Sequence, residues 1–280
     1  SAANSFDKWI DNGSELDMLG SMATFGYNER DMTTEAKVID TPKVVYEAQG
    51  LFHPFLGRNA VRNDFSVSDR NFYIITGANM AGKSTFLRSL GINYVLAMNG
   101  MPVFANRLTL SRFNLFTSMR TTDDLTHGIS YFNAELLRLK QIIDAISPVK
   151  SVNNKPAQSR DEKMVSPETD SLPSGENRND VSKRRGATLI ILDEILKGTN
   201  SEDKLSGSRM FLEYVANRNV TGVIATHDLK LSAMTDEYPD RFHNFCFEIA
   251  LGTDVTYTYK ITPGVARNQN ATFLLNKLLH

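Results

Sequence analysis

Several features that mark particular protein classes are missing from this 280-residue chain. A single cysteine, Cys246, excludes a disulfide framework and a cysteine-based metal site, which suits a reducing cytoplasm, and its apolar neighbours predict a core position. No stretch reaches the roughly 18 uninterrupted apolar residues of a membrane span, and the N-terminus has no apolar signal region. We therefore expect a soluble, cytoplasmic segment that makes no membrane contact.

An excess of charge of either sign is also missing, because 31 basic residues are balanced by 32 acidic ones and the net charge is −1. A domain that grips DNA by itself usually carries a basic face, so any DNA contact is expected to lie in other domains. Hydrophobic residues make up 41% of the chain, which suffices for a sizeable core in one large domain.

The most informative feature that is present is a glycine-rich loop. Residues 72–76 read as a buried strand, an amphipathic helix is expected from Lys83 onwards, and the pattern G-x-x-x-x-G-K-[ST] lies between them. Unpaired N–H groups at a helix N-terminus favour anions, which predicts a triphosphate site. Lys83 is then a candidate catalytic residue at the β and γ phosphates, and Ser84 a ligand of Mg²⁺. The expected nucleotide contacts are Gly77, Ala78, Asn79, Met80, Ala81, Gly82, Lys83, Ser84 and Thr85.

A second apolar strand, expected at residues 188–192, ends in two adjacent carboxylates. Asp193 is expected to hold Mg²⁺, and Glu194 is the candidate catalytic group that orients and polarises the attacking water. A third strand, expected at residues 221–226, ends at His227. Because ligands bind at the carboxyl edge of strands in open α/β sheets, His227 is a candidate sensor of the γ-phosphate.

The order of elements predicts the fold class. Strands alternate with helices from residue 72 to residue 226, which is typical of an α/β fold with a mostly parallel sheet flanked by helices. A short N-terminal helical segment is expected at residues 5–25. Residues 147–185 hold four of the nine prolines and no aromatic residue, which predicts a flexible polar insertion. Further strands are expected at residues 43–48, 102–105, 112–117, 242–249 and 255–261. Further helices are expected at residues 131–146, 203–216 and 271–279, and Ser130 is a possible N-cap of the first of them.

Together, the motifs resemble the C-terminal ATPase domain of the MutS family of DNA mismatch repair proteins. Four blocks follow the order of that family: the glycine loop filled by Asn-Met, a segment with the signature serine, the Walker B strand with its following loop, and a switch histidine. Two upstream stretches are similar to the end of the family's lever helix and to the part that helps to enclose the adenine. The matching segments are residues 76–85, 123–132, 193–199, 225–227, 15–23 and 52–56, with Asn63 and Asp64.

The resemblance implies a P-loop NTPase of the ABC-ATPase type at residues 36–280, preceded at residues 1–35 by the end of the lever region. It implies binding of ATP with Mg²⁺, hydrolysis to ADP and phosphate, and contacts from His53 and Asn63 near the adenine. It also implies a homodimer, or a MutS-like heterodimer, formed through the ATPase face with Ser130 completing the partner's site in trans. Closure of that dimer would be coupled to DNA binding by domains outside this chain, in mismatch repair or recombination.

Some residues depart from the family pattern and indicate a divergent member. Leu196 and Lys197 stand where the family has Gly-Arg, and residues 201–207 differ from its Tyr-Asp-Gly stretch. Two other functions stay open. An ATPase subunit of another ABC system should carry a Leu-Ser-Gly-Gly-Gln-like signature, to which residues 128–130 are the nearest match. A nucleotide-binding interaction module with little turnover is compatible with the divergent loop after Glu194.

Overall fold

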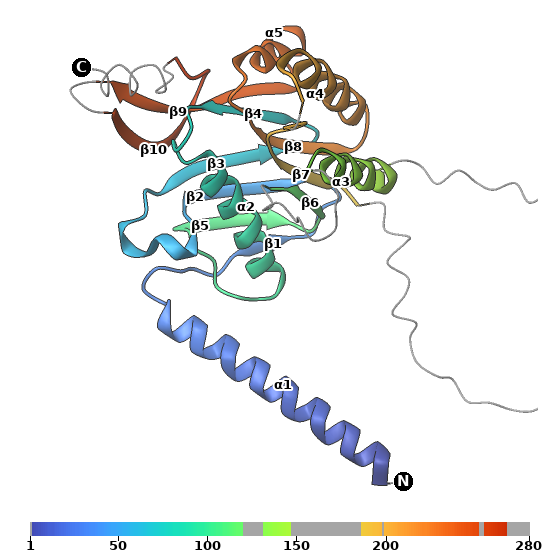
Figure 1. Ribbon diagram of the computed structural model, residues 1–280. Coiled ribbons are helices and arrows are strands. Elements are labelled where there is room, and N and C mark those ends of the chain that lie inside the picture. Colours follow the sequence, from blue (N-terminus) through green and yellow to red (C-terminus); the bar gives the residue numbers. More distant parts are fainter. Residues whose placement is uncertain (1, 120–130, 147–185, 198, 252–254, 268–280) are drawn as a thin grey trace, which may run out of the picture. The chain divides into compact units, whose positions relative to one another are not determined.

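The computed structural model describes residues 2–119, 131–146, 186–197, 199–251 and 255–267 (Figure 1). The predictions for Ser130, for the insertion at residues 147–185 and for a helix at residues 271–279 lie outside these residues. Within the described part of the chain, no helix combines the length and the apolar character that a membrane span requires. The described residues form a mixed α/β fold with two sheets.

The larger sheet has six strands in the order β10-β9-β4-β8-β7-β6. The five strands from β9 to β6 run parallel, and β10 is antiparallel to β9. The central strands β4, β8 and β7 are buried along their whole length, which explains their uninterrupted apolar sequences. The strands are β4 (Phe72–Gly77), β6 (Asn114–Ser118), β7 (Thr188–Asp193), β8 (Val220–Ala225), β9 (Phe242–Leu251) and β10 (Val255–Pro263).

The smaller sheet has four strands in the order β1-β5-β2-β3. Strand β2 is antiparallel to both β3 and β5, whereas β1 is parallel to β5. The expected mostly parallel arrangement is therefore found in the larger sheet, and the fold as a whole is mixed. The strands are β1 (Lys37–Ile39), β2 (Val45–Leu51), β3 (Asn63–Ser68) and β5 (Arg107–Ser111).

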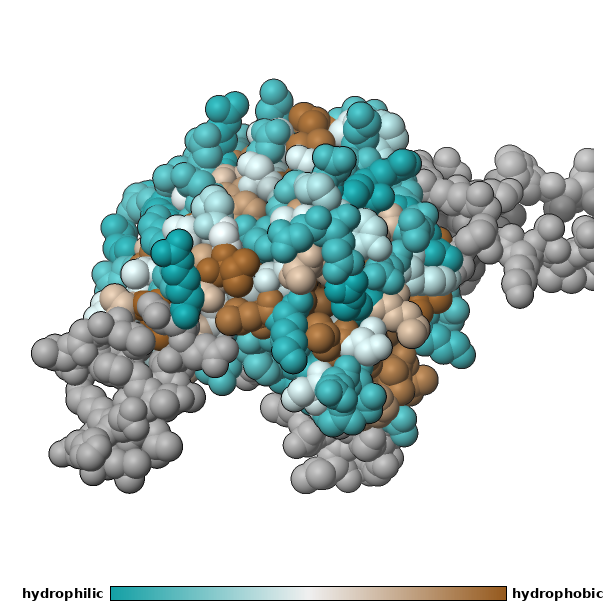
Figure 2. Space-filling view, turned by 90° about the horizontal axis from the view of Figure 1, so that it is seen from above, coloured by the Kyte–Doolittle hydropathy of each residue, from teal (hydrophilic) through white to brown (hydrophobic). Residues whose placement is uncertain are grey.

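Helices cover both faces of the larger sheet (Figure 1). Helix α2 (Lys83–Met98) shares one apolar core with that sheet and with the smaller one, and the Tyr46 hydroxyl in β2 donates a hydrogen bond to the Leu90 carbonyl oxygen at 3.0 Å. A second core lies on the other face, under α3 (Tyr131–Ile146), α4 (Ser201–Ala216) and α5 (Met234–Glu237). Seen from above, the surface is mainly hydrophilic with scattered apolar patches (Figure 2).

The N-terminal helix α1 (Ala2–Asn28) confirms the helix expected at residues 5–25. Its apolar side chains are largely exposed, and Trp9 reaches 79% exposure. The C-terminal end of α1 is anchored by Phe25, whose ring packs edge-on against Phe104 with centroids 5.9 Å apart. The helix therefore joins the rest of the fold through its last turns.

Some local predictions were wrong in detail. Residues 102–105 form no strand, because the Ala105 N–H turns back to the Val103 carbonyl oxygen at 3.1 Å, and Val103 makes an isolated bridge with Thr34. The strand expected at residues 43–48 begins at Val45 and runs to Leu51. Cys246 is buried in β9, as expected.

Candidate functional site

The segment that follows β4 turns tightly into helix α2. Gly77 has a φ of 153°, and a Cβ atom there would lie 2.9 Å from the Phe247 carbonyl oxygen, so this position requires glycine. Gly82 is the N-cap of α2 with a φ of 107°, and no side chain caps that helix end. The first N–H groups of α2, which lack partners inside the helix, are thus directed toward the loop.

Lys83 reaches back into this loop from the first position of α2. Its Nζ donates hydrogen bonds to the Gly77 carbonyl oxygen at 2.6 Å and to the Ala78 carbonyl oxygen at 2.9 Å. The lysine is 7% exposed, so its charge acts in a region of low dielectric constant. Ammonium and helix N-terminus together favour an anion in the loop.

A cavity of about 810 Å³ lies beside the loop. Its size falls within the roughly 300–1,000 Å³ that is usual for small-molecule sites. The loop residues from Asn79 to Thr85 line it together with His53 and Asn63, so the structure brings together most of the residues expected to contact a nucleotide. Gly77 and Ala78 are not among the lining residues, and their carbonyl oxygens accept the hydrogen bonds from Lys83.

The two residues expected near the adenine have local roles of their own. His53 is the N-cap of the short helix η1 (Pro54–Asn59), and its ring accepts the Phe55 N–H at 3.3 Å. Burial, helped by the charge of Arg88, lowers the pKa of His53 and so favours a neutral ring at the cavity. The Asn63 amide donates to the Tyr259 carbonyl oxygen at 3.0 Å and accepts the Ile261 N–H at 2.9 Å, which ties β3 to β10.

Sequence reasoning missed two aromatic residues of the cavity, Phe247 of β9 and Tyr259 of β10. Each belongs to a strand that carries no nucleotide-binding motif. Tyr259 has a φ of 53° at an irregularity in the pairing of β10 with β9. No signal in the sequence marks this irregularity, which aims the tyrosine at the cavity.

The carboxyl ends of β4, β8 and β7 lie side by side at one edge of the larger sheet. The Thr226 N–H donates to the Ile75 carbonyl oxygen at 2.9 Å, and the Glu194 N–H donates to the Ala225 carbonyl oxygen at 2.9 Å. Asp193 and Glu194 at the end of β7, and His227 just after β8, therefore lie at the edge from which the glycine loop leaves β4.

Glu194 is a buried carboxylate that lies beside two lysine ammonium groups and an imidazole ring. One oxygen contacts His227 Nδ1, and the other lies 2.9 Å from Lys197 Nζ and 4.0 Å from Lys204 Nζ. Burial alone would raise the pKa of Glu194, but hydrogen bonds from His227 and Lys197 outweigh it and lower the pKa to about 2. Glu194 is therefore ionised at neutral pH and can orient a water molecule. Lys204, from α4, was not identified from the sequence.

The donor set at this edge fits magnesium. Ser84 offers a hydroxyl oxygen at the start of α2, Asp193 offers a buried carboxylate at the end of β7, and α2 packs on β7. Among the described residues, no group of three or more His, Cys, Asp and Glu side chains could hold a metal ion. Few protein ligands suffice for Mg²⁺, which usually keeps several waters and binds substrate phosphates.

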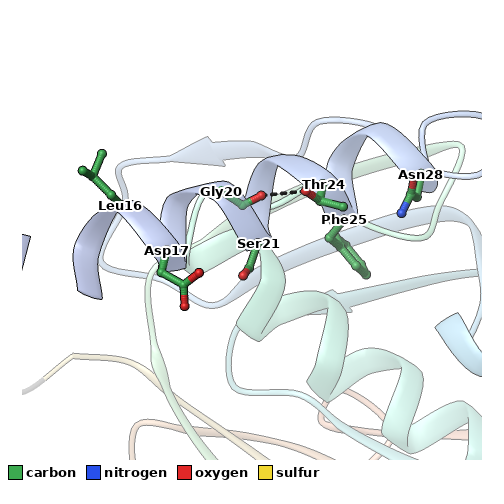
Figure 3. Close-up of a pocket in the computed structure, with 7 residues that line it drawn as sticks. All are labelled: Leu16, Asp17, Gly20, Ser21, Thr24, Phe25 and Asn28. Carbon is green, nitrogen blue, oxygen red and sulfur yellow. Dashed lines mark hydrogen bonds between the residues drawn. The ribbon is translucent and has the colours of Figure 1, made fainter. Parts of the chain in front are cut away.

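A second hollow, on helix α1, is shown in Figure 3. All seven of its lining residues, from Leu16 to Asn28, belong to this one helix. The Thr24 hydroxyl is satisfied within the helix by the Gly20 carbonyl oxygen at 2.8 Å. Because its walls come from a single helix, this hollow is less suited to enclose a ligand than the cavity beside the glycine loop, which residues of several elements line.

Comparisons with known proteins agree with this picture. A family model described as MutS domain V matches residues 73–152. A DNA mismatch repair protein MutS from Thermotoga maritima is 28% identical over 225 residues, which cover 79% of this chain and 24% of the relative. A DNA mismatch repair protein MutS from Methanococcoides burtonii is 26% identical over 265 residues, which cover 89% of this chain and 25% of the relative. Human MutS protein homolog 4 is 26% identical over 233 residues, which cover 78% of this chain and 21% of the relative.

The chain spans about a quarter of the length of the curated relatives that it matches. The family model begins at Tyr73 in β4 and extends through the glycine loop and α2, so the match includes the segment that lines the cavity. The chain is therefore similar to proteins of the MutS family over most of its length, and the similarity includes the glycine loop.

Proposed function

We propose that this chain binds Mg-ATP and hydrolyses it to ADP and phosphate, as the ATPase domain of a MutS-like protein that acts in DNA mismatch repair or recombination. One observation carries the proposal. The glycine loop at the N-terminus of α2 opens into a cavity of about 810 Å³, and the strand that carries Glu194 ends at the same sheet edge. The names of the relatives support mismatch repair as the setting.

In this proposal the binding step uses residues 77–85. The N–H groups at the start of α2 and the Lys83 ammonium take the phosphates, while Phe247 and Tyr259 provide apolar surface for the base. Ser84 and Asp193 would hold Mg²⁺, which neutralises charge on the phosphate oxygens.

The hydrolysis step depends on Glu194. Its ionised carboxylate orients a water molecule whose oxygen forms a bond to the γ-phosphorus, while the bond to the β–γ bridging oxygen breaks and leaves its electron pair on ADP. The water proton passes to the carboxylate or to the phosphate. His227 holds one carboxylate oxygen, and Lys83 stabilises the negative charge on the transferring group.

The assembly part of the proposal follows from the family. Two copies, or this chain and a MutS-like partner, would close on ATP through their ATPase faces, with Ser130 of one subunit completing the site of the other. DNA would be bound by domains outside this chain, in line with its net charge of −1. Closure would then transmit the nucleotide state to those domains.

The test is Glu194→Gln in the full protein. It should still bind ATP, lose turnover by a factor on the order of 10²–10⁴, and accumulate an ATP-bound dimer on size exclusion. Lys83→Met should instead weaken ATP binding. Glu202→Gln, at an exposed position in the first turn of α4, is the matched control and should behave as wild type.

Three results would contradict the proposal. Undiminished hydrolysis in Glu194→Gln would show that another group orients the water. Tight ATP binding without measurable hydrolysis in the wild-type protein, with and without DNA, would identify a nucleotide-binding interaction module, which the divergent Leu196 and Lys197 favour as the second candidate. An ATPase activity indifferent to DNA would favour another ABC system.

A further inference from the structure

Helix α3 presents a buried carboxylate to the loop that follows Glu194. Glu135 is 8% exposed, and its two oxygens accept the backbone N–H groups of Leu196 at 2.6 Å and Lys197 at 2.9 Å. Two successive N–H groups that converge in this way form a concavity for an anion. Hydrogen bonds to an ionised group are roughly twice as strong as neutral ones, so α3 holds this loop firmly.

The loop adopts a backbone that its own sequence does not favour. Glu194 has a φ of 65° and Leu196 a φ of 57°, a region that residues with side chains rarely adopt. On the side of α4, the Leu196 side chain covers Gly207, where an added Cβ would lie 2.4 Å from Leu196 Cδ1. Contacts with two helices therefore impose the shape of the loop.

The shape of the loop decides where the Lys197 ammonium lies. Lys197 Nζ is 2.9 Å from one Glu194 oxygen, while His227 contacts the other. The Glu194 side chain is 2% exposed and that of Lys197 is 24% exposed, so the pair is largely shielded from water. A shift of the Lys197 backbone would release one oxygen and allow the carboxylate to turn.

We propose that Glu135 is a positioning residue for hydrolysis, which holds the Leu196 and Lys197 N–H groups so that Lys197 orients Glu194. The inference rests on the proposed ATPase function and concerns turnover alone. The described residues that line the nucleotide cavity come from elements other than α3, so the loss of Glu135 leaves nucleotide binding in place. The route from Glu135 to the reacting water runs through Lys197 and then Glu194.

The test compares Glu135→Ala, Glu135→Gln, Lys197→Met and the double variant E135A/K197M in the full protein. We expect Glu135→Ala to lower kcat by roughly 10- to 100-fold, with KM and the Kd of a fluorescent ATP analogue unchanged within about threefold. Glu135→Gln keeps one acceptor and should lose less. The double variant should be no slower than the slower single variant, because both changes act on one interaction. Asp144→Ala, exposed on the same helix, is the control.

Three outcomes would overturn the inference. A kcat within about twofold of wild type in Glu135→Ala would remove the positioning role, and fully multiplicative losses in the double variant would exclude the route through Lys197. A parallel loss of ATP affinity and melting temperature would show a general structural role. If Glu135→Ala does not fold, the kcat and Kd values of Glu135→Gln and Lys197→Met are compared with those of the wild type instead. A wild-type protein without hydrolysis would refute the proposed function itself, which is measured first.

Discussion

The two halves of the candidate site are built in different ways. The phosphate half is one continuous segment, residues 77–85, whose shape follows from glycine positions and a helix N-terminus. The carboxylate half is a loop at residues 193–197 whose unfavourable backbone conformation is held by hydrogen bonds to Glu135 of α3. A side chain of this loop also packs against Gly207 of α4. In the proposed function, the difference teaches that phosphate binding would depend mainly on local sequence, whereas turnover would depend on how helices pack against the larger sheet.

The largest effect is expected from a substitution that disrupts the phosphate half. Gly77→Ala places a Cβ atom 2.9 Å from the Phe247 carbonyl oxygen, a backbone atom that cannot turn aside, so the loop must shift. We expect ATP affinity to fall on the order of a hundredfold, as measured by isothermal titration calorimetry.

The matched control for this change lies in the following helix. Gly91 of α2 has no atom within 4 Å of an added Cβ, so Gly91→Ala should leave ATP affinity unchanged and raise stability by up to about 1 kcal/mol. Equal losses in the two variants would show that the loop does not depend on the conformation of Gly77.

An intermediate effect is expected from a substitution that disrupts the carboxylate half. Gly207→Leu needs the space that the Leu196 side chain occupies, so we expect kcat to fall roughly tenfold with little change in Kd for ATP. A second change, Leu196→Gly, should restore much of the rate, because it frees that space and relieves a left-handed residue that costs about 1–2 kcal/mol.

This rescue sharpens the comparison between the halves. Steady-state kinetics on both single variants and the double variant would measure it. A double variant no faster than Gly207→Leu would mean that Leu196 and Gly207 do not share one packing site, and a change in Kd as large as the change in kcat would remove the distinction between the halves.

The smallest expected effect concerns a part of the cavity wall that belongs to neither half of the site. Asn63→Ala leaves the Tyr259 carbonyl oxygen and the Ile261 N–H without their partner. Unfolding in denaturant should show a loss of about 1–3 kcal/mol, and ATP affinity should fall only a few-fold. Asn114→Ala, at an exposed position of β6, should change neither quantity. A loss of affinity as large as that of Gly77→Ala would assign Asn63 a direct role in binding.

Much of the larger sheet could be predicted because its strands are buried on both faces. Strands β4, β7 and β8 appear in the sequence as unbroken apolar runs. Strand β3, at Asn63–Ser68, was missed because it buries only alternate residues and contains polar side chains on both faces. Strand β1 has three residues, too few for any periodicity to appear.

The sequence by itself determined which chemical groups the candidate site contains. Gly77, Lys83 and Glu194 could be predicted as site residues because the backbone they need and the groups they supply are encoded in short contiguous segments. Only the tertiary structure decided which groups surround them. Asn63 meets Tyr259 across 196 positions, and Glu135 meets Leu196 across 61. Such contacts require assembled sheets and packed helices, and no local pattern encodes the register that brings those atoms within hydrogen-bonding distance.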